Sequence, residues 1–289
     1  MSDLPFAPAA ASIAERLYRA VDAEGKIPRA LDALGPLRGR DVVLLDDAPR
    51  FGVPQLLRLG ARVTVVDRGA GPVAEEPASA LVGAAAPGRV ADALTVEADA
   101  PALVEDAPAL TVVRGSPVAT GLPEASADAV VALWSAMSGP CPEEVAEADR
   151  VLRPGGRLLV LHDYGRDDLE PLRGANASAD LVRWSRRDGW YLSNGFRIHV
   201  IHAFWTFDST EEAAAVLRAG FGAAGEVIAG RIHRPRVAHN VAIYHRSRGD
   251  GPTAGRPAAD RGAGVENGPA ATVRGPVAAG AGDVAEAGA

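Results

Sequence analysis

Short apolar runs alternate with stretches of helical spacing along most of the chain. The apolar runs are rich in Leu and β-branched residues, are nearly continuous, and are bounded by Gly, Pro or Asp. This pattern is typical of strands that are covered on both faces of a sheet. We therefore predict strands at 41–46 (DVVLLD), 62–67 (RVTVVD), 110–114 (LTVVR), 129–133 (AVVAL) and 157–162 (RLLVLH).

Segments with helical spacing of apolar residues lie between and around these runs. Helices are predicted at 54–59, 142–152 and 210–219, and Ser209 or Thr210 with Glu212 supplies a cap for the last of them. Alternation of strand and helix predicts an α/β fold, a doubly wound parallel sheet with helices on both faces.

Two further segments flank this pattern. Residues 11–34 are predicted to form a helical cover, because Ile13, Leu17, Tyr18 and Val21 form one apolar stripe. The aromatic-rich stretch 178–207 is predicted to be a helix followed by a strand, packed over the sheet edge. Its aromatic residues fit a hydrophobic core or a lid over an apolar acceptor.

The end of the chain differs in composition from the rest. Residues 249–289 contain no aromatic residue and no Leu, Ile or Met. Such a segment has little to bury and is expected to be a disordered Ala/Gly-rich tail. The predicted organisation is therefore an N-terminal helical cover at 1–39, one α/β domain at 40–248, and the tail.

Charge and cysteine content narrow the range of partners. The formal charge of −7 gives no basis for non-specific attraction to nucleic acid or to an anionic membrane, and neither is expected as a partner. The single cysteine, Cys141, excludes an intramolecular disulfide and a Cys-based zinc site. No apolar run approaches the roughly 20 residues that span a bilayer, and the first residues lack the pattern of a signal peptide. We expect a cytoplasmic protein, whose oligomeric state the sequence does not indicate.

The first place to look for a ligand site is the loop after the first strand. In doubly wound sheets ligands bind beyond the carboxyl ends of the strands, and here that loop reads DDAPRFG over residues 46–52. The second strand ends in Asp67, whose carboxylate can accept hydrogen bonds from both hydroxyls of a ribose. The other interpretation of Asp67 is a strand-terminating residue in a turn.

Three later segments complete an ordered set of motifs. They read GSPVATGLP at 115–123, ADAVVALW at 127–134 and VLRPGGRLLV at 151–160. In the last of these, Pro154 prevents continuation of a helix and the two following glycines permit a tight turn into a strand. With RVTVVD upstream, this set resembles the class I S-adenosylmethionine-dependent methyltransferases of the small-molecule type. The resemblance covers residues 38–160 well and continues loosely to about residue 244.

The resemblance carries expectations about fold and cofactor. It implies a Rossmann-like, seven-stranded, mostly parallel sheet whose last strand, near 240–245, runs antiparallel. It implies S-adenosylmethionine as the cofactor, with its methionine part at the 46–52 loop, its ribose on Asp67, and its adenine between Ser116 and Pro117. Trp134, with Ser135, would line the pocket. The cofactor-binding residues expected from the resemblance are Asp46, Ala48, Arg50, Gly52, Asp67, Ser116, Pro117 and Trp134.

The glycine loop departs from the family pattern D-x-G-x-G-x-G. Asp46 and Gly52 match it, but Ala48 and Arg50 occupy the first two glycine positions, where backbone approaches the ligand closely. The Arg50 side chain must point away, pair with the carboxylate of the cofactor, or fill the pocket. Two functions therefore stay open: methyl transfer from S-adenosylmethionine to an unidentified small molecule, or a catalytically inactive methyltransferase-like domain that acts as a binding or interaction module.

The candidates for acid–base chemistry follow the fifth predicted strand. We expect the side chains of His162, Asp163 and Tyr164 to emerge at the carboxyl edge, where His162 could act as a general base assisted by Asp163. The alternative is that all three are turn and edge residues.

A metal site is not expected. His199 and His202 are three positions apart and would converge only in a helix. His233, His239 and His245 are expected at the surface.

Overall fold

The computed structural model describes residues 11–45, 51–68, 110–134 and 136–249. Within these residues, seven strands form one sheet in the order β3-β2-β1-β4-β5-β7-β6. All neighbouring strands pair in parallel except β7, which runs antiparallel to both β5 and β6. The predicted doubly wound fold with an antiparallel last strand is thus confirmed. The strands are β1 (Asp41–Leu45), β2 (Arg62–Asp67), β3 (Leu110–Arg114), β4 (Ala127–Leu133), β5 (Leu152–Asp163), β6 (Arg197–Thr206) and β7 (Arg236–Ser247).

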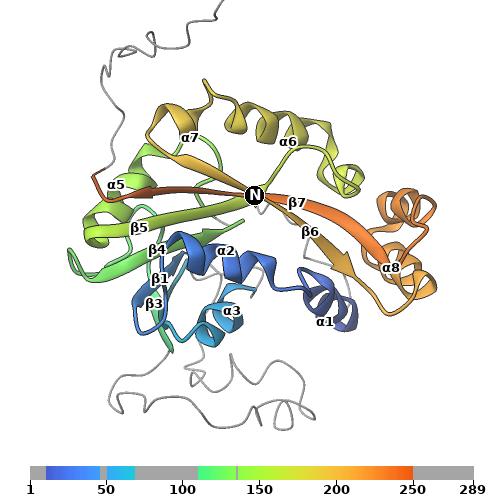
Figure 1. Cartoon of the computed structure of the whole chain (residues 1–289), viewed down its shortest axis with the longest axis horizontal. Helices are drawn as coiled ribbons and strands as arrows, with labels where there is room; N and C mark the ends of the chain where they lie inside the picture. Colours follow the sequence, from blue (N-terminus) through green and yellow to red (C-terminus); the bar gives the residue numbers. More distant parts are fainter. Residues whose placement is uncertain (1–10, 46–50, 69–109, 135, 250–289) are drawn as a thin grey trace, which may run out of the picture. The chain divides into compact units, whose positions relative to one another are not determined.

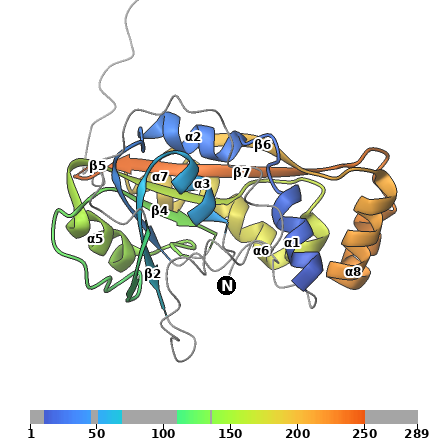
Figure 2. The same cartoon turned by 90° about the horizontal axis from the view of Figure 1, so that it is seen from below.

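Helices cover both faces of the sheet (Figure 1). One face is covered by α1, α2 and α3 and the other by α5, α6 and α7, so that two separate hydrophobic clusters form, one on each side. Helix α8 packs against α1 and α6 at the β6 side of the sheet (Figure 2). The helices are α1 (Ala11–Ala20), α2 (Lys26–Leu34), α3 (Gly52–Arg58), α5 (Pro142–Val151), α6 (Glu170–Ser185), α7 (Trp190–Ser193) and α8 (Thr210–Ala229).

The LRPGG segment forms the predicted turn, but β5 begins earlier than expected. Helix α5 ends at Val151, and Leu152 is already extended and pairs with Ala127. The next pair joins Ala129 to Arg157, so the intervening residues bulge out of the ladder, and Gly155 has a φ of 78°. The strand therefore starts five residues before the predicted position, because Leu152 pairs with β4 on the helix side of the turn.

The N-terminal cover consists of two helices instead of one. Asp22, with a φ of 48°, breaks the segment between α1 and α2, and its carboxylate accepts hydrogen bonds from the amides of Lys26 and Ile27. Helix α1 is tied to α8 by an ion pair between Arg16 and Glu212. The predicted cap of α8 is present, since the Ser209 hydroxyl accepts the amide of Glu212 at 3.0 Å.

The aromatic-rich segment contributes to the core and forms the edge of the sheet. It runs through the end of α6, through α7 and into β6, so the predicted helix and strand are present with one additional short helix. Trp184 and Tyr191 are buried in the cluster on the α5 side, and Trp205 is buried on the α1 side.

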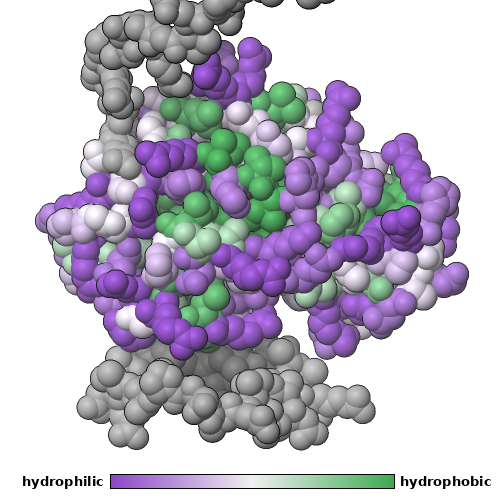
Figure 3. All heavy atoms as spheres, viewed as in Figure 1, coloured by the Kyte–Doolittle hydropathy of each residue, from purple (hydrophilic) through white to green (hydrophobic). Residues whose placement is uncertain are grey.

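Charged and polar residues are spread over much of the face seen in Figure 3, among smaller hydrophobic areas. No helix of the described residues is long and apolar enough to cross a bilayer. The predicted tail at 249–289 lies outside the described residues from residue 250 onwards.

Candidate functional site

The carboxyl ends of the parallel strands meet at one edge of the sheet, where doubly wound folds bind ligands. Strand β1 lies between β2 and β4, which brings the ends of β2 and β4 to either side of the end of β1. Asp46, Ala48 and Arg50 in that loop lie outside the described residues, as does Ser135. Gly52 is the first residue of α3 and is buried.

Asp67 and the turn after β3 lie side by side at this edge. Asp67 is the last residue of β2 and is half-buried, and its carbonyl accepts the amide of Gly115 at 3.1 Å. Ser116 and Ala119 exchange two backbone hydrogen bonds of 3.0 Å, which close a tight turn that contains the buried Pro117. A Cβ on Gly115 would lie 2.7 Å from the carbonyl oxygen of Thr120. The turn therefore needs glycine at this position.

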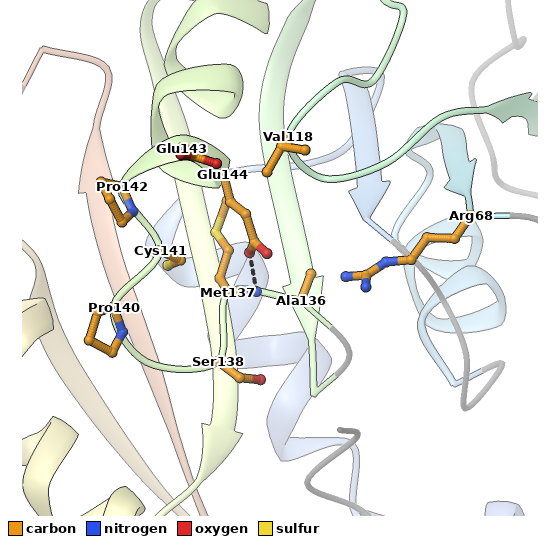
Figure 4. Close-up of a pocket in the computed structure, with 10 residues that line it drawn as sticks. All are labelled: Arg68, Val118, Ala136, Met137, Ser138, Pro140, Cys141, Pro142, Glu143 and Glu144. Carbon is orange, nitrogen blue, oxygen red and sulfur yellow. Dashed lines mark hydrogen bonds between the residues drawn. The ribbon is translucent and has the colours of Figure 1, made fainter.

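A pocket of about 430 Å³ opens between these elements (Figure 4). Its lining comes from Arg68 directly after β2, from Val118 in the turn after β3, and from the segment that joins β4 to α5 together with the first turn of α5. Burial raises the pKa of the Cys141 thiol in that segment, so the thiol is neutral at physiological pH. The guanidinium group of Arg68 lies at one side of the pocket, and the carboxylates of Glu143 and Glu144 lie at the other.

The loop after β4 is held in an uncommon backbone conformation. Trp134 and Met137 both have a φ of 58°, a region that side-chain-bearing residues rarely occupy. The Met137 amide donates to Glu144 at 2.5 Å, as Figure 4 shows, and its carbonyl accepts hydrogen bonds from His162 Nε2 and the Tyr191 hydroxyl. Three side chains thus fix the backbone of one residue of the pocket wall on both sides of its Cα. Strained backbone that is held this firmly is frequent at functional sites.

His162 and Asp163 are buried instead of emerging at the edge. Strand β5 continues through Asp163, which pairs with Val241, so neither residue lies in a turn after the strand. Consecutive strand residues point to opposite faces, and the two side chains accordingly cannot act as a contacting pair. The expectation of an exposed His162 assisted by Asp163 is therefore wrong. His162 Nε2 lies 3.0 Å from a carbonyl oxygen, which can only accept, so this nitrogen carries the proton and donates. A catalytic role for either residue stays a prediction.

Asp163 is the centre of a buried polar network. Trp134 Nε1 donates to its Oδ1 at 2.8 Å, His239 Nε2 lies 2.9 Å from the same oxygen, and Arg173 binds Oδ2. Arg173 also binds Asp167 at 2.7 Å. Burial would raise the pKa of Asp163, but His239 and Arg173 together hold it below its ordinary value. The carboxylate is therefore ionised and satisfied by several donors.

His239 is a residue of this network that the sequence did not identify. We expected it at the surface, yet it is fully buried on β7. Asp163 and His239 are 76 positions apart in the sequence, and only the register of β5 against β7 brings them together. His199 and His202, the two histidines considered as metal ligands, lie on strand β6. Among the described residues, no three or more His, Cys, Asp or Glu side chains are grouped so that they could hold a metal ion.

Trp134 is fully buried beside this network. Its ring meets Phe51 edge to face with centroids 5.5 Å apart, and Phe51 directly precedes α3. Trp134, which was expected to line the pocket, does not line the 430 Å³ pocket; it instead packs the loop after β4 against Phe51 at the start of α3.

Comparison with known proteins finds one family model that is similar to part of the chain. Residues 52–160 match the family model described as a methyltransferase domain. Within these residues the chain is similar to a methyltransferase domain. The resemblance seen in the motifs of the sequence is thereby confirmed, and the match spans the segment from α3 to β5. No curated protein sequence matches the chain significantly.

Solved methyltransferase structures resemble the chain at low sequence identity. A protein described as a candidate type II methyltransferase from Anaeromyxobacter dehalogenans is 16% identical, with 78% of this chain and 96% of that chain covered and a TM-score of 0.45. A candidate methyltransferase of an antibiotic biosynthesis pathway from Anabaena variabilis is 14% identical, with 79% and 99% covered and a TM-score of 0.46. A geranyl diphosphate methyltransferase in complex with S-adenosylmethionine is 18% identical, with 77% and 84% covered and a TM-score of 0.41.

Proposed function

We propose that this protein transfers a methyl group from S-adenosylmethionine to a small molecule. The observation that carries the proposal is the position of Asp67, half-buried at the end of β2 beside the turn of Ser116 and Pro117, in a segment that is similar to a methyltransferase domain. A carboxylate at this position suits the two hydroxyls of a ribose.

The residues present fit the proposed cofactor. The tight turn after β3 brings backbone close to the pocket, and the space that a Cβ on Gly115 would occupy is already filled by backbone. Ser116 and Pro117 would flank the adenine, Asp67 would hold the ribose, and Gly52 with Asp46, Ala48 and Arg50 would face the methionine part. When bound, S-adenosylmethionine supplies an electrophilic methyl group on a sulfonium.

This chain's own contribution to the reaction is positioning. Displacement at a sulfonium methyl disperses positive charge, so alignment of nucleophile and methyl carbon supplies most of the rate enhancement. The Met137 backbone, fixed at its amide by Glu144 and at its carbonyl by His162 and Tyr191, gives the pocket a rigid wall for that alignment. His162 and Asp163 serve this positioning through their hydrogen bonds, and an acceptor that is already nucleophilic needs no base.

A second candidate function is favoured by the glycine loop. Ala48 and Arg50 replace two glycines that the family uses for close approach of the backbone. Under this alternative the domain has lost cofactor binding and serves as a binding or interaction module.

Calorimetric titration with S-adenosylhomocysteine separates the two functions. We expect the wild-type protein to bind, and Asp67→Asn to weaken binding about tenfold, because a hydrogen bond to a charged group contributes about 1.5–3 kcal/mol. The control is Asp180→Asn on α6. The Asp180 carboxylate pairs with the exposed Arg183, so this variant should bind S-adenosylhomocysteine like wild type. No heat with wild-type protein would refute the enzyme and support the module. In Arg50→Gly, tighter binding would show that Arg50 obstructs the pocket, and weaker binding that it grips the cofactor carboxylate.

A further inference from the structure

Four buried side chains from the ends of four neighbouring strands form a connected polar cluster. We call Trp134, Asp163, Trp205 and His239 the indole–histidine cluster. Asp163, the last residue of β5, pairs with Val241 on β7. From Val241 onwards, β7 continues to pair with β6 as far as the pair of Arg236 with Thr206. Asp163 and His239 therefore lie diagonally on one face, as do His239 and Trp205, and diagonal neighbours are within reach of long side chains.

The hydrogen bonds of the cluster determine where the His239 proton lies. Trp205 Nε1 lies 3.1 Å from His239 Nδ1, and an indole nitrogen can only donate. His239 Nδ1 must then accept, so the proton of the neutral ring is on Nε2. Nε2 donates to Asp163 Oδ1 at 2.9 Å, and Trp134 Nε1 donates to the same oxygen at 2.8 Å. Every donor in the cluster faces an acceptor.

This chain of hydrogen bonds ends at Trp134, in the loop after β4. The Trp134 ring stacks on His239 with an interplanar angle of 16° and centroids 6.1 Å apart. It also packs edge to face on Phe51, which directly precedes α3. The orientation of the Trp134 indole is therefore set on one side by Asp163 and His239, and it supports Phe51 on the other.

We propose that His239 is a positioning residue that, through Asp163, fixes Trp134 against Phe51 and thereby positions the start of α3, where Gly52 is expected to contact the cofactor. This inference rests on the proposed function. It assigns no chemistry to His239. The ring acts as a neutral bridge that accepts from Trp205 and donates to Asp163, and its contribution is measured in cofactor affinity.

Two substitutions at position 239 separate the bridge from simple packing. Asn places an acceptor near the position of Nδ1 but cannot reach Asp163, whereas Gln places an amide donor near the position of Nε2. We expect His239→Asn to weaken S-adenosylhomocysteine binding about tenfold, because Asp163 Oδ1 loses one of its two donors and no longer holds Trp134 in place, and His239→Gln to recover most of the affinity. The control is His245→Asn, a half-buried histidine on the same strand near the opposite edge of the sheet, which should bind like wild type.

A second measurement does not depend on cofactor binding. Long-range ¹H–¹⁵N spectra of the wild-type protein should show His239 as the neutral Nε2–H tautomer and a Trp134 indole proton shifted downfield by its carboxylate partner. His239→Asn should move that indole resonance and His239→Gln should restore it. A charged or Nδ1–H ring, or an unmoved indole resonance, would overturn the proposal, as would equal loss of binding in both variants. If wild-type protein binds no S-adenosylhomocysteine, the proposed function fails, while the spectra still report whether the bridge exists. If His239→Asn fails to fold, the spectra of the wild-type protein and His239→Gln decide.

Discussion

The contact between α5 and the turn after β3 allows a quantitative test of the pocket wall. Glu147 on α5 accepts the amide and the hydroxyl of Thr120 at 2.9 and 2.6 Å, and it binds Arg150 through both carboxylate oxygens. Arg150 in turn donates to the carbonyl of Leu122 at 2.8 Å. The Glu147 side chain is 10% exposed. One carboxylate thus connects α5 to the segment that carries the predicted adenine contacts.

The expected effect of Glu147→Gln follows from the pKa of this carboxyl. Hydrogen bonds, first of all from Arg150, lower the pKa of Glu147 to about 2. With an ordinary pKa in the unfolded chain, this corresponds to at most about 3 kcal/mol of stability at neutral pH. Arg150 is 39% exposed, so solvent screening reduces the expected loss to about 1–2 kcal/mol.

The pH dependence gives this prediction a definite sign. Because the folded pKa lies below the unfolded value, the stabilisation is fully present above about pH 4.5 and is lost as the pH falls towards 2. Urea unfolding of wild type and Glu147→Gln should therefore differ most at pH 7 and less at pH 3.5. Glu226→Gln, which breaks an exposed pair with Arg218, is the control and should unfold like wild type. A difference below about 0.3 kcal/mol at pH 7, or one that does not change with pH, would refute the reasoning.

Two further substitutions test the cover and the loop after β4. Arg16→Ala removes the ion pair with Glu212 that ties α1 to α8. We expect the free energy of unfolding in urea to fall by about 1 kcal/mol and proteolysis near α1 to become faster. An unchanged cleavage rate would contradict this anchoring role. Gly139→Ala places a Cβ 2.9 Å from Trp184 Nε1 at a φ of 86°, which should cost about 1–3 kcal/mol. Gly155→Ala has a φ of 78° in open space, so it measures backbone strain alone and should lower the melting temperature less.

The sheet could be predicted well because its central strands are buried on both faces. The runs that became β1 and β2 have the predicted bounds to within one residue, since their nearly continuous apolar sequence is largely buried in the sheet. Strand β3 also has its predicted bounds, although it is the edge strand and most of its residues are exposed. The start of β5 was harder to predict from the sequence. Its early start depends on the pairing of Leu152 with Ala127 across a turn of glycines, and pairing is a tertiary event that local sequence does not encode.

The site was only partly predictable for related reasons. Asp67 and the turn of Ser116 could be placed because the end of a strand is a local property. His162 and Asp163 could not be paired, and the alternation of side chains along a strand explains why. His239 was missed because its partners Asp163 and Trp205 belong to strands distant in sequence.

The most direct test of a cofactor site at this edge is a crystal structure of the protein grown with S-adenosylhomocysteine. We predict ligand density at the carboxyl ends of β1, β2 and β4, with the ribose hydroxyls within hydrogen-bond distance of the Asp67 carboxylate and the adenine beside Ser116 and Pro117. Density elsewhere on the protein, or none at saturating concentration, would contradict the account.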